Sequence, residues 1–291
     1  MKPSVFNGVA TALYTPFTPS DKKIDYDALD RLIDRQIDAG ISAIVVLGTT
    51  GESVTLNEEE RNEIISHTLN RVHKRIPVIV GTGGNCTDTV ILRSKKAENL
   101  GANALLVVTP YYNKCNDSGL IKHYTAIAQA CNLPIIVYNV PSRTAFNVKP
   151  ELYAELAKID NICGIKEANC SKEQLQSVLE YVGDLLPLYC GDDKKFLESL
   201  EVGAKGIISV TSNIIPDKII DNYLDFQYFY KFSDNLDEIN NALFSDVNPI
   251  PLKYAVRLLY GEGYGLRLPL TETDYITQKQ IETALINIGA L

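Results

Sequence analysis

The chain has 291 residues, of which 45% are hydrophobic and 22% are charged, and its formal net charge is −8. This length is enough to bury one large α/β core with an appendage, and the acidic balance provides no basic stripe for nucleic acid. No apolar run reaches the roughly 18 to 20 residues of a membrane span, and the N-terminus lacks the apolar core of a signal peptide, so we expect a cytoplasmic protein that contacts no membrane.

The use of cysteine and histidine argues against disulfides and metals. No C-x-x-C pair occurs, and a cytosolic protein of this size keeps its thiols reduced. The three histidines form no H-E-x-x-H motif, so we expect no metal site built from them. The six cysteines expected to be free thiols are Cys86, Cys115, Cys131, Cys163, Cys170 and Cys190.

Eight apolar runs alternate with helical segments along the chain. The first helical segment ends at Gly40 and the third at Gly101, the usual residue after a helix. Asn57 and Glu60 have the spacing of a capping box and open the second. The predicted strands cover residues 6–14, 42–47, 77–80, 104–108, 134–138, 162–166, 186–190 and 206–210, and the predicted helices between the first five cover residues 25–39, 57–74, 87–100 and 119–130.

This alternation predicts parallel strands joined by right-handed crossovers. Eight units in 225 residues match a closed (β/α)8 TIM barrel, which is therefore the predicted α/β fold. A doubly wound open sheet is the alternative, weakened because no G-x-G-x-x-G follows the first strand. Strand signals stop after residue 216, so we predict a barrel domain over residues 1–225 and a small C-terminal helical domain over residues 226–291.

One predicted strand, residues 162–166, ends on Lys166. The carboxyl ends of barrel strands carry the active site, and a buried lysine is rare unless it is paired or has a chemical task. Burial favours the neutral amine, which can attack a carbonyl carbon. Lys205 directly precedes a strand and so belongs to the opposite end of the barrel. The alternative reading of Lys166 is a solvated lysine just past a strand.

Two further candidate side chains lie at or after the end of the preceding predicted strand, residues 134–138. Tyr138 ends that strand, and a phenol beside an amine can transfer the protons that imine formation requires. Arg143 lies on a loop stiffened by Pro141, where a guanidinium can bind a carboxylate with two hydrogen bonds. The alternatives are an aromatic lid on the barrel core for Tyr138 and an ordinary surface arginine for Arg143.

The glycine-rich loops do not indicate a phosphate site. No Gly-Lys-Ser/Thr follows the glycines at residues 81–84, and the loop after the seventh strand carries Asp192 and Asp193, which would repel a phosphate. A nucleotide-dependent enzyme is therefore remote. The pattern favours a small, unphosphorylated carbonyl acid as substrate.

Six segments, taken together and in order, resemble the dihydrodipicolinate synthase family of pyruvate-dependent class I aldolases, whose superfamily also contains N-acetylneuraminate lyase. Each segment is weak by itself, but the resemblance runs over essentially the whole chain. The segments are residues 48–53 (GTTGES), 110–113 (PYYN), 138–143 (YNVPSR), 165–168 (IKEA), 248–253 (NPIPLK) and 266–270 (LRLPL).

The resemblance implies a condensation of pyruvate with aspartate semialdehyde in diaminopimelate and lysine biosynthesis, without a metal or organic cofactor. It implies that Lys166 forms a Schiff base with pyruvate and that Tyr138 transfers protons at the imine. Thr49 and Tyr112 would complete the proton relay, with Tyr112 reaching in from a neighbouring subunit. The family is typically a homotetramer built as a dimer of dimers, and some members are dimers.

The resemblance also implies a set of binding residues. Thr50 and Ile208 would contact pyruvate, and Gly191 lies with them at the carboxyl ends of the strands. Arg143 would receive the carboxylate of aspartate semialdehyde. A sister aldolase for sialic acid or a keto-deoxy sugar acid is the alternative, but a sugar substrate calls for neutral partners at the place of Arg143. A non-catalytic pyruvate-binding barrel is a second alternative, which the full set of site residues argues against.

Lysine-inhibited members of the family bind free lysine in a cleft at the dimer interface. Thr89 replaces the glutamate that would pair with an ammonium group there, and Glu58 and Arg61 replace histidines. Arg61 would repel the ligand, while Glu58 could offset part of the loss. We therefore expect an enzyme that lysine does not inhibit. The matching positions in this chain are Ser53, Val54, Glu58, Arg61, Asn85, Thr89 and Tyr111.

Overall fold

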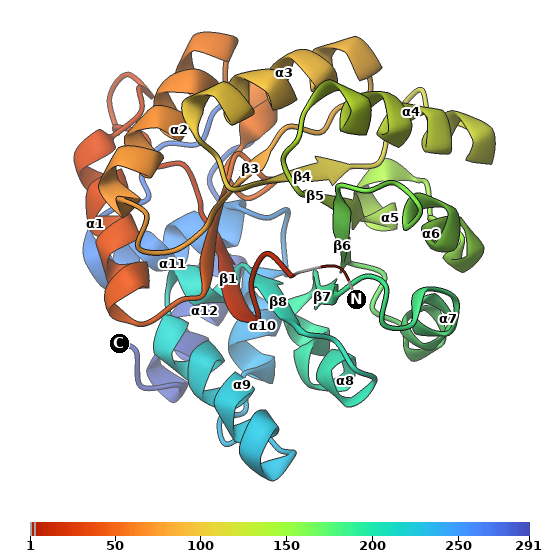
Figure 1. Ribbon diagram of the computed structural model, residues 1–291. Coiled ribbons are helices and arrows are strands. Elements are labelled where there is room, and N and C mark those ends of the chain that lie inside the picture. Colours follow the sequence, from red (N-terminus) through yellow and green to blue (C-terminus); the bar gives the residue numbers. More distant parts are fainter. Residues whose placement is uncertain (1, 3) are drawn as a thin grey trace. The chain divides into compact units, whose positions relative to one another are not determined.

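The computed structural model describes residue 2 and residues 4–291, and its strands form a parallel barrel closed in chain order, from β1 to β8 (Figure 1). The predicted (β/α)8 fold is therefore confirmed, and the open doubly wound sheet is excluded. The strands are β1 (Gly8–Ala12), β2 (Ala43–Val46), β3 (Val78–Gly81), β4 (Ala104–Val108), β5 (Ile135–Asn139), β6 (Ile162–Glu167), β7 (Leu188–Cys190) and β8 (Gly206–Ser209).

Helices follow the strands and continue beyond the last one. The α-helices are α1 (Tyr26–Asp38), α2 (Glu58–Val72), α3 (Thr87–Leu100), α4 (Asp117–Ala130), α5 (Pro141–Thr144), α6 (Pro150–Leu156), α7 (Lys172–Val182), α8 (Phe196–Glu201), α9 (Pro216–Phe229), α10 (Asp237–Leu243), α11 (Ile250–Tyr260) and α12 (Tyr275–Asn287). Three short 3-10 helices are η1 (Ser53–Thr55), η2 (Asp193–Lys195) and η3 (Thr211–Asn213).

The internal contacts of the chain define two compact units. Unit one comprises Met1–Gly8 and Pro77–Ile208, and unit two comprises Val9–Ile76 and Ser209–Leu291. The predicted division at residues 225 and 226 falls inside α9 and stays a prediction.

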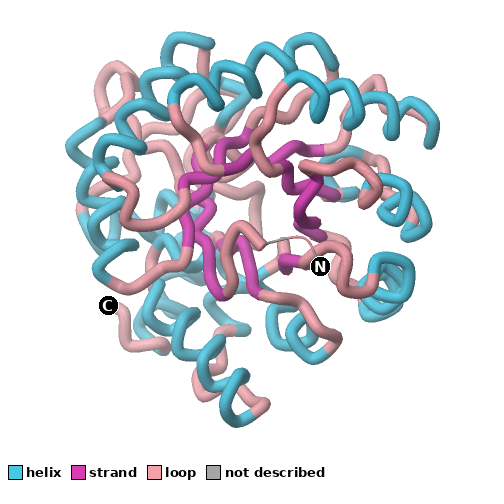
Figure 2. The backbone as a smooth tube through the Cα atoms, viewed as in Figure 1, coloured by secondary structure: helices cyan, strands magenta, loops and turns pink. Residues whose placement is uncertain are grey.

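Unit one contains the strands from β3 to β7 and the first three residues of β8. Its strand residues are almost all buried, and Figure 2 shows these strands (magenta) bordered by the helices of the unit (cyan). Gly206, at the start of β8, has a φ of +155°, and a Cβ there would lie 1.8 Å from the carbonyl oxygen of Gly8. The amide of Gly8 donates to the carbonyl of Lys205 over 3.0 Å. The close approach of Gly8 to Gly206 thus requires a glycine at position 206.

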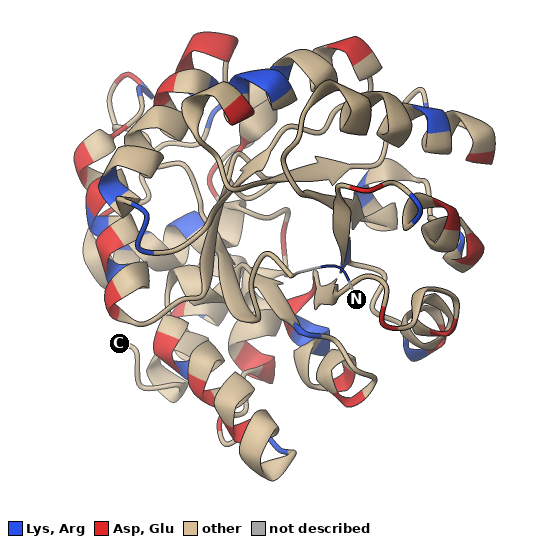
Figure 3. Ribbon diagram, viewed as in Figure 1, with Lys and Arg blue, Asp and Glu red and all other residues tan. Residues whose placement is uncertain are grey.

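Unit two begins with β1, α1, β2 and α2. The predicted capping box of α2 is confirmed, because the Asn57 side chain accepts from the Glu60 amide over 2.9 Å and the Glu60 carboxylate accepts from the Asn57 amide over 3.0 Å. Acidic and basic residues both occur on α1 and α2 (Figure 3), and Arg71 on α2 pairs with Asp34 on α1. Such exposed pairs contribute at most about 1 kcal/mol each, so the buried faces hold these helices.

Three further findings bear on membranes, metals and disulfides. In residue 2 and residues 4–291, no helix combines the length and apolar character that a membrane crossing needs. Within that same described part of the chain, no three histidine, cysteine, aspartate or glutamate side chains gather as they would around a metal ion. The six cysteines are free thiols.

Candidate active site

Lys166 lies near the carboxyl end of β6 in unit one and is only 6% exposed. In the parallel register of β5 with β6, Lys166 is the direct partner of Tyr138. Its side-chain nitrogen Nζ lies 4.4 Å from the centroid of the Tyr138 ring. The structure therefore brings together the lysine and the tyrosine that the sequence singled out, and it excludes a solvated Lys166.

Tyr138 is fixed by the strands on both sides. It pairs with Val108 of β4, and its carbonyl accepts from the Thr109 amide over 3.0 Å. The residue is 7% exposed, so both members of the pair are largely shielded from water. Such a desolvated position strengthens electrostatic interactions and suits an amine and a phenol that exchange protons.

Arg143 lies on a one-turn helix, α5, and not on the loop that the sequence predicted. Pro141 occupies the first turn of α5, where its fixed φ and missing N–H are tolerated. The Arg143 amide donates to the carbonyl of Val140 over 2.9 Å, and the Arg143 side chain is exposed. The short helix fixes the backbone of Arg143, and the exposed side chain remains accessible to a ligand.

The loop after β4 presents a tyrosine to solvent. Tyr112 has a φ of +66° and is 90% exposed, which is unusual for a large aromatic residue. Tyr111 beside it is half-buried. The side chain of Asn113 donates to the carbonyl of Asn85 over 3.0 Å and so fastens the end of this loop.

Gly191 and Ile208 complete the predicted residues of unit one that concern the substrate. Ile208 lies in β8 and is 1% exposed. A Cβ at Gly191 would lie 2.9 Å from the carbonyl oxygen of Glu167, to which the Gly191 amide donates over 2.7 Å. Gly191 therefore has a packing role, because only a glycine lets the end of β7 approach β6 this closely.

In unit two, Thr49 and Thr50 lie on the tight loop after β2. Two residues in the left-handed region bracket this loop, Leu47 with a φ of +58° and Glu52 with a φ of +50°. Strained residues of this kind persist where the surroundings enforce them and are common at functional sites. Thr50 is 3% exposed, and its hydroxyl oxygen accepts from the Asn248 side-chain amide over 3.0 Å.

A buried ion pair, missed at the sequence level, lies beside that loop. The ammonium group of Lys253, on α11, pairs with Glu52, and the two side chains are 2% and 0% exposed. Lys253 Nζ also donates to the carbonyl of Gly265 over 3.0 Å and lies 4.2 Å from the Phe17 ring centroid. Burial lowers the pKa of Lys253, and the nearby Glu52 carboxylate opposes that shift. Lys253, the last residue of the segment at 248–253, therefore has a structural role through burial and its ion pair.

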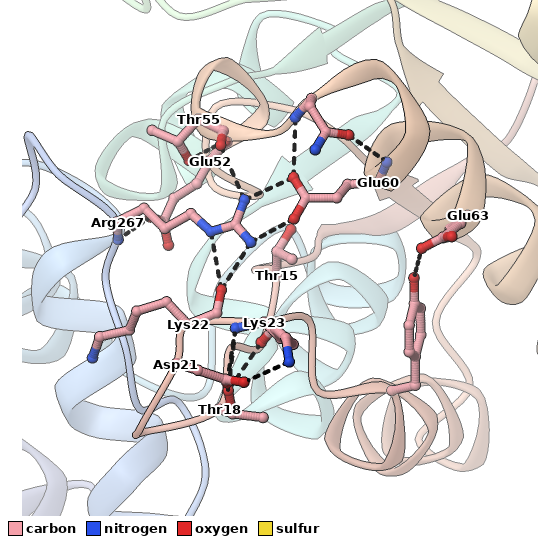
Figure 4. A network of polar contacts seen from close by, with 12 residues as sticks. Thr15, Thr18, Asp21, Lys22, Lys23, Glu52, Thr55, Glu60, Glu63 and Arg267 are labelled. Carbon is pink, nitrogen blue, oxygen red and sulfur yellow. Dashed lines mark hydrogen bonds and ion pairs between the residues drawn. The ribbon is translucent and has the colours of Figure 1, made fainter.

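Arg267, in the segment at 266–270, has a comparable structural role (Figure 4). Its guanidinium donates to both carboxylate oxygens of Glu60, over 2.8 and 2.6 Å, and to the carbonyls of Lys22 and Thr55. Its backbone amide donates to Glu52 over 3.3 Å. These hydrogen bonds link the C-terminal extension of unit two to the start of α2.

The residues expected to correspond to a lysine-binding cleft divide between the units. In unit two, the Arg61 side chain is buried, donates to the carbonyl of Ser53 over 2.9 Å, and has its Nε 3.9 Å from Glu58. Val54 is 80% exposed. In unit one, Thr89 lies in the first turn of α3, and hydrogen bonds from it lower the pKa of the exposed thiol of Cys86.

Glu167 is a second residue that the sequence analysis did not identify as functional. It directly follows Lys166, is 0% exposed, and receives hydrogen bonds from the side chains of Asn139, Tyr153 and Gln174. Burial raises the pKa of its carboxyl to about 7, and the hydrogen bonds oppose that shift. In the sequence, Glu167 is marked by its position directly after an apolar strand and within the segment at residues 165–168.

A family model, a sequence relative and solved structures that match this chain all belong to one enzyme family. Residues 5–288 match the model of the Dihydrodipicolinate synthetase family. The chain is 43% identical over 288 residues to the 4-hydroxy-tetrahydrodipicolinate synthase of Alkaliphilus oremlandii, covering 95% of this chain and 97% of the relative. It is similar to a monomeric dihydrodipicolinate synthase variant, with a TM-score of 0.95, 39% identity, and coverage of 99% and 98% of the two chains. It is also similar to the chloride-inhibited dihydrodipicolinate synthase of Acinetobacter baumannii complexed with pyruvate, with a TM-score of 0.94, 37% identity, and coverage of 98% and 99%.

Proposed function

The chain belongs to the dihydrodipicolinate synthetase family, and from this premise we propose that Lys166 forms the Schiff base with pyruvate and that Tyr138 transfers the protons of that step. The protein is a lyase of the class I aldolase type that acts in diaminopimelate and lysine biosynthesis, and pyruvate is its substrate. The observation that supports the role of Lys166 is its burial at the end of β6, with Nζ 4.4 Å from the Tyr138 ring.

The chemistry follows from the amine. The neutral Lys166 amine adds to the carbonyl carbon of pyruvate, and loss of water gives a protonated imine. This imine withdraws electrons, so the methyl carbon releases a proton and becomes the nucleophilic end of an enamine. The enamine carbon attacks the aldehyde of the second substrate, aspartate semialdehyde. The amino group of the adduct then closes onto the former imine carbon and expels Lys166 as the free amine.

The remaining site residues support these steps. We assign Thr49 and Tyr112 to the proton relay of Tyr138, and Thr50 and Ile208 to contacts with pyruvate. The exposure of Tyr112, at 90%, suits a side chain that serves a neighbouring subunit. We place Gly191 among the binding residues, and its lack of a side chain lets the end of β7 lie close to the backbone of Glu167.

Borohydride reduction in the presence of pyruvate tests Lys166. The reduced imine should add one three-carbon unit to the peptide that contains Lys166, as seen by mass spectrometry. Lys205→Ala, at a lysine that precedes β8, is the matched control and should label as the wild type does. Labelling of another lysine, or undiminished labelling of Lys166→Ala, would contradict the assignment.

Arg143 is the residue that distinguishes the second substrate. A guanidinium on the exposed α5 can bind the carboxylate of aspartate semialdehyde with two hydrogen bonds. Arg143→Ala should leave pyruvate trapping largely intact while condensation falls roughly 10- to 150-fold, the equivalent of about 1.5 to 3 kcal/mol. Equal losses of trapping and condensation would point to a structural role. A panel of aldehydes also tests the sister aldolases, since a sugar acid aldolase would prefer a polyhydroxy aldehyde.

We propose a homotetramer built as a dimer of dimers, or a dimer, in which Tyr112 completes the partner's site. The support is the exposure of Tyr112 and its left-handed backbone. The inactive variants Tyr112→Phe and Lys166→Ala should regain partial activity when refolded together, because mixed dimers contain one intact site. No recovery despite measured subunit exchange would count against a shared site. The cytoplasmic location expected from the sequence stays a prediction.

We also propose that free lysine does not inhibit the enzyme. Thr89 offers no carboxylate, and Glu58, 3.9 Å from the Arg61 Nε, already faces a cation. The loss of one charge-assisted hydrogen bond, about 1.5 to 3 kcal/mol, would move a sub-millimolar affinity to the millimolar range or beyond. The measurement is the initial rate against lysine concentration at subsaturating pyruvate. Half-inhibition below about 1 mM would show that Glu58 or another group has rebuilt the site.

A further inference from the structure

The two residues that follow Tyr138 and Lys166 form a pair of their own. Successive side chains of a strand point to opposite faces, so Asn139 and Glu167 point away from the face that carries the tyrosine and the lysine. Asn139 and Glu167 are direct partners in the β5–β6 register. The Asn139 side-chain amide donates to both Glu167 carboxylate oxygens, over 2.8 and 3.0 Å. Each member of the reactive pair is thus followed by a member of a buried polar pair.

Glu167 accepts further hydrogen bonds from two helices and from the backbone just after β6. Tyr153 on α6 donates its hydroxyl over 3.0 Å, and Gln174 on α7 donates its amide over 3.4 Å. The backbone amide of Asn169, just after β6, donates over 2.8 Å. The carboxyl therefore joins the end of β6 to β5, α6 and α7, and these elements lie close together in Figure 1.

The same pair closes the segment that carries Arg143. The Asn139 side-chain oxygen accepts from the Val148 amide over 3.2 Å, and the Asn139 amide group also donates to the Asn147 side chain over 2.8 Å. These contacts hold both ends of the segment from residue 139 to residue 148, which includes α5. Because Asn139 holds both ends of this segment, the position of Arg143 depends on the contacts of Asn139.

We propose that Glu167 is a positioning residue for the Schiff-base reaction. Together with Asn139, it holds the ends of β5 and β6 in place from the strand face opposite to Lys166 and Tyr138. In this way it sets the distance between Lys166 and Tyr138 and the position of Arg143. This inference rests on the proposed function of Lys166. A misplacement of about 1 Å in a reacting group can cost 10²-fold in rate, so a cluster that holds two strand ends in register has a direct kinetic consequence.

The donors around Glu167 match an ionised carboxylate. A carboxylate only accepts hydrogen bonds, and every partner named above donates to it, whereas a protonated carboxyl would turn one O–H toward other donors. The titratable groups near it are Tyr153 from α6 and the thiol of Cys170, which donates to the Glu167 carbonyl over 3.0 Å and lies 3.6 Å from Cys190 of β7. Lys166, on the same strand, points to the opposite face. With a folded pKa of about 7, Glu167 changes charge near neutral pH.

Two buried tyrosines give a matched test. Tyr153 and Tyr124 are each 0% exposed, on α6 and α4 of unit one, and each donates one hydroxyl hydrogen bond, Tyr153 to Glu167 and Tyr124 to the carbonyl of Val107. Tyr153→Phe and Tyr124→Phe should lose similar stability. We expect kcat to fall roughly 10-fold or more in Tyr153→Phe alone. Because ionised Glu167 loses a donor, the acid limb of its pH–rate profile should move to higher pH, while Tyr124→Phe keeps the wild-type profile.

A second variant covers a failure of Tyr153→Phe to fold. Glu167→Gln keeps the shape and removes the titration, so its kcat should fall and its acid limb should lose the step near pH 7, with the exposed Glu173→Gln on α7 as control. Wild-type kcat and pH profile in Glu167→Gln, or identical kinetics in the two tyrosine variants, would overturn the inference. A wild type that neither traps pyruvate nor turns over would instead overturn the proposed function, so the two failures are distinguishable.

Discussion

Two buried glutamates in this molecule are held in opposite ways. Glu167 in unit one is surrounded by neutral donors, and burial raises the pKa of its carboxyl to about 7. Glu52 in unit two is equally buried but pairs with the ammonium group of Lys253, whose side chain is 2% exposed. Glu167 directly follows Lys166, and Glu52 comes shortly after Thr50 in the chain. Both Lys166 and Thr50 are assigned to the reaction.

The difference shows what each arrangement can do. Neutral donors satisfy a carboxylate geometrically but leave its burial cost uncompensated by charge, so the group remains titratable near neutral pH. A buried cation balances the charge, but the removal of either partner then strands the other in the interior. The surroundings of Glu167 are therefore suited to positioning with a pH dependence, and the Glu52–Lys253 pair to permanent anchoring of the loop after β2.

The largest expected effect comes from breaking the ion pair. Lys253→Met should lower the free energy of unfolding by about 3 to 5 kcal/mol, because Glu52 is left as an uncompensated buried charge. Urea denaturation at pH 7 measures this loss. Lys279→Met, which breaks the exposed pair with Glu282, is the control and should cost no more than about 1 kcal/mol. If both variants lose equally little, the Glu52–Lys253 pair does not anchor the loop, and the contrast between the two glutamates fails.

A smaller effect is expected from the titration of Glu167. Its folded pKa, about 7, lies above the unfolded value, about 4.3, so the folded state binds the proton more tightly. The stability that this provides is fully present below the unfolded pKa and is lost as pH rises through the folded one. Between about pH 4.3 and 7 the wild type should lose up to about 3 kcal/mol more than Glu167→Gln.

Unfolding measured by urea at a series of pH values tests that expectation. The exposed Glu173→Gln variant should follow the wild type throughout. Parallel stability curves for the wild type and Glu167→Gln would show that Glu167 does not titrate as its neutral surroundings require.

The smallest effect concerns Arg267, which adds to the anchoring around Glu52. Arg267→Lys keeps the charge but cannot reproduce the two-pronged contact with Glu60 together with the bonds to Lys22 and Thr55. We expect a loss of about 1.5 to 3 kcal/mol, read from the midpoint of thermal unfolding. Arg257→Lys, at an arginine that pairs with the more exposed Glu272 and lies over the rings of Tyr254 and Tyr264, is the comparison and should cost less. Equal shifts in both variants would reduce Arg267 to an ordinary surface arginine.

The periodic signals in the sequence were sufficient to predict the barrel and the adjacent strand ends that carry Tyr138 and Lys166. Apolar runs that recur with helical segments between them predict eight parallel strands because burial on both faces demands continuous apolar stretches. Lys166 stands out in the sequence since it interrupts such a run at its carboxyl end. The one-turn helix at Arg143 was predicted as a loop, because four residues are too few to show a helical period.

The tertiary structure alone decided which polar residues are buried together. Asn139 and Glu167 are 28 residues apart in the chain, and only the register of β5 with β6 makes them partners. Lys253 reads as an ordinary helix residue until α11 is packed and its ammonium group meets Glu52. Sequence patterns report which faces avoid water, since that preference is repeated along an element; a single buried hydrogen bond or ion pair has no period, so it exists only where the folded chain places donor and acceptor within reach.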